Sequence, residues 1–285
     1  MQRRYRVLDV FAERPPAGNP LAVVIDGDDL DDERMQAYAN WTNLSETTFL
    51  LPPTEAGAAG GADYRVRIFT PSEELPFAGH PTLGSCRAWL DAGGRPAQAG
   101  LVIQECGVGL VPIRVDDGGG QAFRAPPPLR SGPVDGETLD RVLAELGLEP
   151  TEVVDSAWLD NGPGWLGLLL PDAAAVLAVE PGTLSEKIGL IGLFPDGANP
   201  EPDVAYEVRA FFDKAGQTAE DPVTGSLNAS AAQWLLAAGR VRAPYRVIQG
   251  TALGRDGRVS ISVDDDGEVW VGGGAAVVVS GTVEL

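Results

Sequence analysis

The chain has 285 residues, of which 44% are hydrophobic and 22% are charged, a composition typical of a soluble globular protein. This length exceeds the usual size of a single hydrophobic core, so two domains are expected. The formal net charge of −20 argues against nucleic acid and against an anionic membrane surface as partners, because both bind basic surfaces.

The sequence predicts a cytoplasmic protein that does not enter a membrane. No signal-like apolar segment follows Met1, and the longest apolar runs, such as 166–170, are far too short to span a bilayer. Two cysteines, Cys86 and Cys106, are too few for a disulfide framework in a chain of this length. Both are expected to be reduced.

Alternating apolar residues and turn residues predict the first elements of the chain. Strands are expected at 6–11 and 21–25, a helix at 28–41 and a strand at 47–51. Glu46 is placed in the loop before that last strand, and residues 52–62 are interpreted as a surface loop.

Two stretches of the chain repeat each other. Tyr64–Phe69 and Tyr206–Phe211 both read Tyr-x-Val-Arg-x-Phe, which alternates as a half-buried strand does. The offset between the tyrosines, 206 − 64 = 142, is close to half of the 285 residues. The chain is therefore interpreted as two copies of one strand–turn–helix unit.

Each repeat continues into an ionisable residue before a proline, His80-Pro81 and Asp221-Pro222. A polar cap before proline predicts the start of a helix, and the glycines Gly93 and Gly239 predict the two ends. His80 and Asp221 are thereby interpreted as equivalent residues at two helix starts, where unpaired N–H groups favour an anion.

The remaining elements complete an α+β fold. A hairpin is predicted from 101–105 and 109–115, a helix at 136–146, and strands at 245–249, 259–263, 269–271 and 276–279. The expected architecture is two pseudo-symmetric domains, each a curled, mostly antiparallel sheet around a central helix of small residues. Glycines at 118–120 and prolines at 126–128 mark the expected boundary between the halves.

The candidate chemical residues each have a structural alternative. His80 is the only histidine, so a multi-histidine metal site is excluded, and no glycine pattern has the context of a phosphate loop or dinucleotide site. No metal and no cofactor are therefore predicted. His80 and Asp221 could equally be capping residues. Gly225 and Ser226 could be packing residues, and Glu46 could be solvated.

Several motifs together carry a resemblance to a known family that extends over nearly the whole chain. They are Asp9–Phe11 with Gly18–Pro20, Asn43–Thr47, Arg67–Pro71, Glu74–Pro81, Asn161–Pro163, Glu220–Ser226 and Gly281–Leu285. In these motifs the chain resembles the PhzF-type isomerases of phenazine biosynthesis, which share the diaminopimelate epimerase fold.

The resemblance implies a cofactor-independent isomerase. Glu46 would move a proton between carbons of a small cyclic or unsaturated amino acid, 2,3-dihydro-3-hydroxyanthranilate in the phenazine enzyme. His80 and Asp221 complete the implied catalytic set, and the residues implied to bind the carboxylate substrate between the halves are Ser45, Gly79, Asn161, Gly225 and Ser226. The family also implies a homodimer, with domains at 1–118 plus 272–285 and at 119–271.

Two other functions stay open at this stage. One is a carboxylate-based amino-acid epimerase or racemase, and the other is a catalytically silent protein that binds small acids on the same scaffold. A two-thiol racemase is excluded because the second half has no cysteine after Cys106. Many relatives carry histidine where this chain has Asn228, which leaves the sub-branch of the family and the substrate open.

Overall fold

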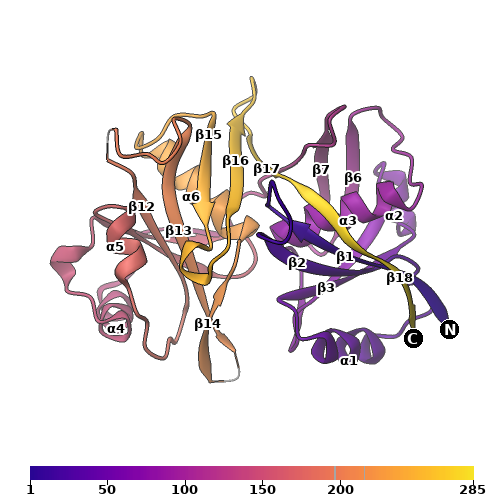
Figure 1. Cartoon of the computed structure of the whole chain (residues 1–285), viewed down its shortest axis with the longest axis horizontal. Helices are drawn as coiled ribbons and strands as arrows, with labels where there is room; N and C mark the ends of the chain where they lie inside the picture. The colour runs from indigo at the N-terminus through magenta and orange to yellow at the C-terminus, as the bar shows by residue number, and fades with distance from the viewer. Residues whose placement is uncertain (196, 215) are drawn as a thin grey trace. The chain divides into compact units, whose positions relative to one another are not determined.

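The computed structural model describes residues 1–195, 197–214 and 216–285, and they form two compact units. The first unit comprises Met1–Pro126 and Gly272–Leu285, and the second comprises Pro127–Val271. The first unit thus extends past the expected boundary at 118 and includes β8 (Gln121–Arg124). In each unit a curled sheet surrounds one helix, α3 in the first and α6 in the second (Figure 1). The fold class predicted from the sequence is confirmed.

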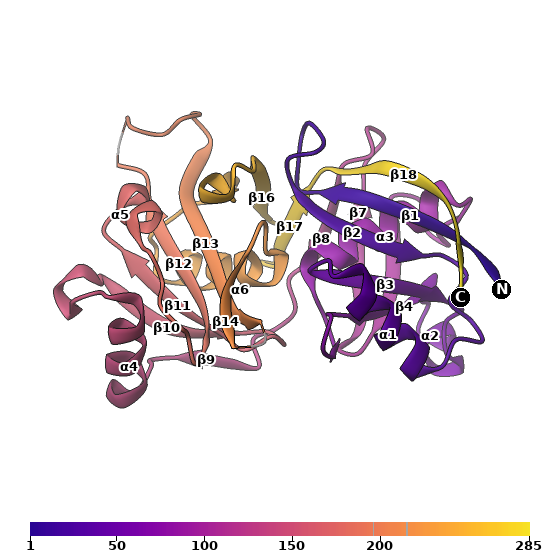
Figure 2. The same cartoon turned by 60° about the horizontal axis from the view of Figure 1, so that its bottom comes forward.

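The first unit contains strands and helices in the order of the chain. They are β1 (Gln2–Val10), β2 (Asn19–Val24), α1 (Asp32–Thr42), β3 (Glu46–Leu51), α2 (Glu55–Ala59), β4 (Tyr64–Phe69), β5 (Glu74–Leu75), α3 (Gly79–Asp91), β6 (Leu101–Cys106), β7 (Gly109–Val115), β8 and β18 (Ala275–Glu284). Their pairings give the order β18-β1-β2-β3-β4-β6-β7-β8, in which β2–β3 and β4–β6 are parallel. β18 lies beside β1, as Figure 2 shows, and brings the two chain ends together.

Helix α3 fills the centre of the first unit. Residues from Gly79 to Cys86 are all buried, and the helix contacts strands from β18 and β1 round to β8. Small residues allow this close approach. A Cβ atom on Gly84 would lie 2.5 Å from a methyl carbon of Leu21. A helix that is buried on all sides is expected to lack a polar face, and this explains its run of small and apolar residues.

The second unit repeats this architecture. Its elements are β9 (Arg130–Gly132), α4 (Gly136–Leu146), β10 (Asp155–Asp160), β11 (Trp165–Leu170), α5 (Ala173–Ala178), β12 (Lys187–Leu193), β13 (Val204–Lys214), β14 (Gln217–Asp221), α6 (Gly225–Ala237), β15 (Tyr245–Gln249), β16 (Gly257–Val263) and β17 (Val269–Gly273). The order β9-β10-β11-β12-β13-β15-β16 has its parallel pairs at β11–β12 and β13–β15, which are the same two places as in the first unit.

The Tyr-x-Val-Arg-x-Phe repeat forms equivalent strands, β4 and β13. In both, the arginine makes a two-pronged ion pair with a glutamate on the next strand, Arg67 with Glu74 and Arg209 with Glu220. Each guanidinium also lies over the phenylalanine ring two residues later, 5.0 Å from its centroid in the first unit and 4.7 Å in the second. The internal repeat is therefore a feature of side-chain contacts as well as of topology.

The strand register corrects the predicted equivalence of His80 and Asp221. Phe69 pairs with Glu74, and Phe211 pairs with Glu220, so the residues that follow, Leu75 and Asp221, are the equivalent pair. Both helices then begin four residues later, at Gly79 and Gly225.

His80 is therefore equivalent to Ser226. The prediction was wrong because the hairpin of β13 and β14 is longer, which raises the offset between the repeats from 142 to 226 − 80 = 146.

The predicted capping roles are also wrong, although the helix ends are confirmed. The N-cap residues are Ala78 and Thr224, and neither bonds the first turn through its side chain. Gly93 and Gly239 follow the two helices with positive φ angles of 96° and 67°, as glycine permits.

Other predicted elements need smaller corrections. α4 and β15 have the predicted bounds. Glu46 lies in β3 rather than in the loop before it, and the predicted surface loop at 52–62 contains α2. None of the described helices is long and apolar enough to cross a membrane.

Candidate active site

In the first unit, Glu46 and His80 face each other. Glu46 is the first residue of β3, and His80 lies in the first turn of α3. The Oε2 atom of Glu46 is 3.4 Å from Nε2 of His80, and the side chains are 13% and 2% exposed. A carboxylate and an imidazole are thus held together in a largely buried position, although 34 residues separate them (80 − 46).

His80 is a neutral imidazole over most of the pH range. Burial lowers its pKa to about 3, and the backbone carbonyl of Pro20 opposes this only in part. The Nδ2 amide of Asn19 is 3.3 Å from Nδ1 of His80. Because that amide nitrogen can only donate, Nδ1 accepts and the ring hydrogen is on Nε2, directed toward Glu46.

A braced loop positions Asn19 against His80. The carboxylate of Asp9 at the end of β1 accepts hydrogen bonds from the backbone N–H groups of Ala17 and Gly18. Gly18 itself passes so close to β1 that a Cβ atom there would lie 2.1 Å from the carbonyl oxygen of Val10. The Gly18-Asn19-Pro20 motif is therefore explained by close backbone packing that delivers Asn19 to the imidazole.

In the second unit, Asp221 and Ser226 lie on either side of the start of α6. Asp221 ends β14 and is 7% exposed, and its Oδ2 accepts a hydrogen bond from the hydroxyl of Thr224 at 2.6 Å. Ser226 is 3% exposed, and its Oγ is 3.0 Å from Nε1 of Trp165. Both polar side chains therefore have defined partners within their own unit.

The contact with Trp165 fixes the direction of the Ser226 hydroxyl. An indole N–H can only donate, so Oγ accepts and the serine hydrogen is available for another acceptor. Asn161, buried completely, donates from Nδ2 to the backbone carbonyl of Ser226 at 3.0 Å. Its loop is held by Asp160, which accepts from the N–H groups of Gly162 and Gly164 as Asp9 does in the first unit.

The structure thus sorts the predicted site residues into two groups. Glu46, His80 and Gly79 come together in the first unit, and Asp221, Gly225, Ser226 and Asn161 come together in the second. Ser45 is half-buried and directly precedes Glu46. Asn161 contacts the backbone of Ser226, so it positions the helix start.

Sequence reasoning missed four residues of these groups, namely Asn19, Trp165, Thr224 and Gln249. Asn19 and Thr224 stand inside motifs that had been recognised, so their position in the motif was an available signal. Trp165 and Gln249 are distant in sequence from the residues they contact, and no local pattern distinguishes them.

Neither thiol is suited to act as a base. Burial raises the pKa of both Cys86 and Cys106, and both cysteines belong to the first unit. Among the described residues, no group of three or more histidine, cysteine, aspartate or glutamate side chains could hold a metal ion.

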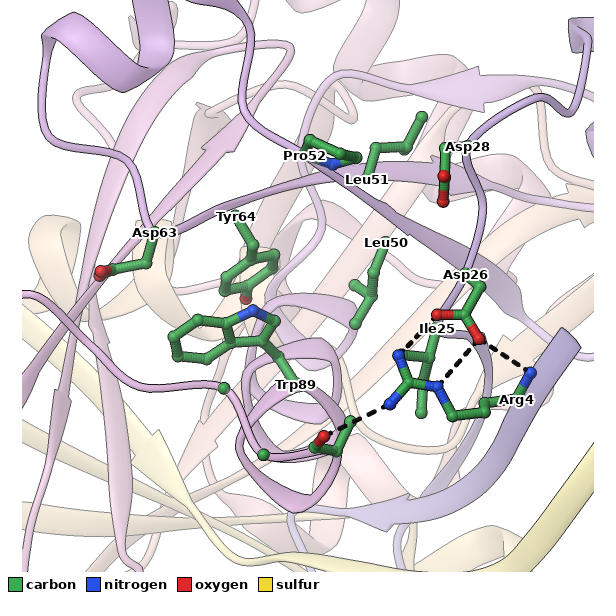
Figure 3. A pocket seen from close by; sticks show the side chains of 13 residues that line it. Arg4, Ile25, Asp26, Asp28, Leu50, Leu51, Pro52, Asp63, Tyr64 and Trp89 are labelled. Carbon is green, nitrogen blue, oxygen red and sulfur yellow. Dashed lines mark hydrogen bonds and ion pairs between the residues drawn. The ribbon is translucent and has the colours of Figure 1, made fainter.

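A hollow of about 320 Å³ lies at the opposite, C-terminal end of α3 (Figure 3). Trp89, which stacks on Tyr64, lines it together with Arg4, whose guanidinium is bonded to Asp26. None of the predicted site residues lines this hollow. It is therefore separate from the candidate site at the helix start.

Comparison with known proteins agrees with this arrangement. The family model described as phenazine biosynthesis-like protein, PhzC-PhzF, matches residues 8–281. The chain belongs to the PhzC-PhzF family. It is 35% identical to the trans-2,3-dihydro-3-hydroxyanthranilate isomerase of Pseudomonas aeruginosa, an alignment that covers 99% of each chain. Since the curated relatives of this PhzC-PhzF protein include named isomerases, it is an enzyme of the isomerase class.

Solved structures show the same fold. A PhzF-family protein of Bacillus anthracis matches with a TM-score of 0.80 at 23% identity, and the match covers all of both chains. A hydroxyproline epimerase of Agrobacterium vitis matches with a TM-score of 0.59 at 14% identity, covering 100% of this chain and 93% of that one. The PhzC-PhzF chain therefore has the curled-sheet architecture that epimerases also use.

Proposed function

We propose that this PhzC-PhzF protein moves a proton between two carbons of a small cyclic, unsaturated amino acid and that Glu46 carries the proton. The observation that supports this is the largely buried Glu46 carboxylate beside the neutral imidazole of His80. An uncharged imidazole does not neutralise the carboxylate by ion pairing, so the carboxylate keeps its basicity.

The proposed reaction conserves every atom. The Glu46 carboxylate removes a proton from one carbon, and the electron pair of the broken C–H bond enters the conjugated system of the substrate. The double bond shifts, and the carboxylic acid returns the proton to another carbon, which restores the carboxylate. One carboxyl group can perform both transfers because it acts in turn as general base and general acid.

The second unit supplies complementary groups for an amino acid. The Ser226 hydroxyl, whose hydrogen Trp165 leaves available, and the start of α6 suit a carboxylate. The Asp221 carboxylate suits an ammonium or amine donor. We therefore propose a zwitterionic or amino-acid substrate, and trans-2,3-dihydro-3-hydroxyanthranilate, on which the Pseudomonas aeruginosa relative acts by name, is the first compound to test.

The decisive test is Glu46→Gln, which preserves shape and hydrogen bonding but cannot accept a proton. We expect kcat for trans-2,3-dihydro-3-hydroxyanthranilate to fall by about 10² to 10⁴, the usual contribution of a general acid–base group, while ligand binding stays within a few-fold of the unchanged protein. Glu33→Gln, the same change at an exposed position in α1, is the matched control. Turnover by Glu46→Gln within a few-fold of the unchanged protein would exclude the proposed base.

The product distinguishes this proposal from an epimerase. Double-bond migration changes the ultraviolet spectrum and the carbon skeleton's proton NMR pattern, whereas epimerisation inverts one centre and leaves both unsaturation and connectivity unchanged. A product that differs from the substrate only in configuration would replace the proposed reaction with the alternative.

A further inference from the structure

A buried chain of hydrogen bonds connects the start of α6 with the end of β15. It consists of Asn228, Gln249, Thr224 and Asp221, which we call the α6 relay, and its members are between 0% and 7% exposed. Gln249 is its centre. The Oε1 atom accepts from the backbone N–H of Thr224 at 2.9 Å, and Nε2 donates to the backbone carbonyl of Asp221 at 3.1 Å.

The backbone determines which way the Gln249 amide points. An N–H group must meet an oxygen and a carbonyl must meet a donor, so only one orientation satisfies both contacts. Nε2 is also 2.9 Å from Oγ1 of Thr224, and an amide NH2 can only donate. The Thr224 oxygen therefore accepts from Gln249, and its own hydrogen is directed to Oδ2 of Asp221, 2.6 Å away.

Asn228 supports the same direction from the next turn of α6. Its Nδ2 donates to the backbone carbonyl of Thr224 and to Oε1 of Gln249, both at 2.9 Å. The relay runs from Asn228 through Gln249 and Thr224 to Asp221, with each donor and acceptor fixed by the one before it. The departure from histidine at position 228 thus retains a side chain that can donate to Gln249.

The first unit shows that a helix start of this kind does not require such a relay. Leu75 and Ala78 occupy the positions equivalent to Asp221 and Thr224, and α3 still begins at the equivalent glycine. Buried polar networks are costly unless every member is satisfied, so a fully built one in only one of two equivalent places points to a role beyond forming the helix.

We propose that Gln249 and Thr224 are positioning residues for the reaction and that they hold the Asp221 carboxylate in one orientation as a hydrogen-bond acceptor for the substrate. The proposal rests on the proposed function, because that function assigns Asp221 to the substrate. Gln249 sets the direction of the Thr224 hydroxyl, and this hydroxyl fixes Asp221. Neither residue exchanges protons with the substrate.

The test uses Thr224→Val, which removes the hydroxyl at nearly constant volume, and Thr224→Ser, which retains it. A hydrogen bond to a charged group is worth about one to two factors of ten in affinity. We expect Thr224→Val to raise KM for trans-2,3-dihydro-3-hydroxyanthranilate about 10- to 100-fold with a smaller change in kcat, and Thr224→Ser to stay within about threefold. Gln249→Glu, which cannot donate to Thr224, should resemble Thr224→Val where its thermal melt shows that it folds.

A double-mutant cycle separates positioning from general structural damage. If Thr224 acts through Asp221, Thr224→Val should cause little further loss in an Asp221→Asn background, whereas structural damage would lower affinity by the same factor in both backgrounds. Equal losses, or an unchanged KM in folded Thr224→Val, would overturn the relay while leaving the proposed function intact. An unchanged KM in Asp221→Asn alone would instead overturn the assignment of Asp221, and the relay with it.

Discussion

The starts of α3 and α6 occupy equivalent positions in two units of the same topology, yet they carry different chemistry. Both follow an arginine–glutamate ion pair and a loop that an aspartate braces, Asp9 in the first unit and Asp160 in the second. These shared contacts are the scaffold. The repeat therefore conserves what aligns the strands and places a helix start in the middle of each sheet.

The differences lie in the residues that the scaffold presents. Register pairs Thr47 with Phe69 and Ile188 with Phe211, so the residues just before them, Glu46 and Lys187, are equivalent. The first unit thus has a carboxylate beside an imidazole, and the second has a carboxylate held by a hydroxyl. The comparison indicates one scaffold used twice, once to present a base and once to present binding groups.

The largest expected effect on stability concerns the two equivalent ion pairs. Arg209 and Glu220 have side chains 8% and 9% exposed, whereas Glu74, the partner of Arg67, is 41% exposed. Removing one partner of a buried pair leaves an uncompensated charge, so Glu220→Gln should cost about 3 kcal/mol of unfolding free energy. Glu74→Gln should cost at most about 1 kcal/mol. Urea denaturation of both variants measures this, and equal losses would show that burial does not distinguish the two pairs.

A somewhat smaller effect is expected at Glu207, where the equivalent residue of the first unit is Arg65. Glu207 is 2% exposed, and burial raises its pKa from 4.5 to about 7, although Thr251, Arg258 and Arg209 oppose the shift. The folded state therefore binds the proton more tightly, and stability falls as the pH rises from 4.5 through 7.

Glu207→Gln removes this penalty. It should raise the unfolding free energy at pH 8 by roughly 3 kcal/mol at most and change it little at pH 4.5. Thermal or urea unfolding at both pH values measures the difference, with Glu33→Gln as the exposed control. A variant that is less stable than the unchanged protein at pH 8 would contradict the buried, unfavourable carboxylate.

The smallest effect is the acid sensitivity that His80 gives to the first unit. Its pKa falls from 6.5 to about 3 on folding, so the unfolded state binds the proton more tightly. The stability due to the neutral ring is complete above pH 6.5 and is lost as the pH falls, by up to about 1.4 kcal/mol per pH unit.

His80→Asn should therefore lose less stability than the unchanged protein between pH 7 and pH 5, by about 2 kcal/mol. Ser226→Ala, at the equivalent position in the second unit, should leave that pH dependence unchanged. Unfolding free energies at the two pH values provide the measurement, and parallel pH profiles for His80→Asn and the unchanged protein would show that His80 is protonated in the folded state.

Local patterns in the sequence were sufficient for most elements. The helix at 136–146 and the strand at 245–249 were predicted with their observed bounds because their periodicity and turn residues are unambiguous. The repeated Tyr-x-Val-Arg-x-Phe strands were found for the same reason. The motifs also identified Glu46 and His80, and the structure brings these two side chains together.

Other features depended on the length of a hairpin and on contacts between distant segments. The equivalence of His80 with Ser226 rather than Asp221 follows from the longer β13–β14 hairpin, which no local pattern reveals. Gln249 reaches Asp221 across a gap of 28 residues.

The sequence by itself determined the two-fold repeat and the helix starts, because backbone preferences and hydrophobic periodicity act over a few residues. Only the tertiary structure decided the strand register, the neutral state of His80 and the direction of the α6 relay. These depend on burial and on hydrogen-bond partners that folding brings together from distant parts of the chain.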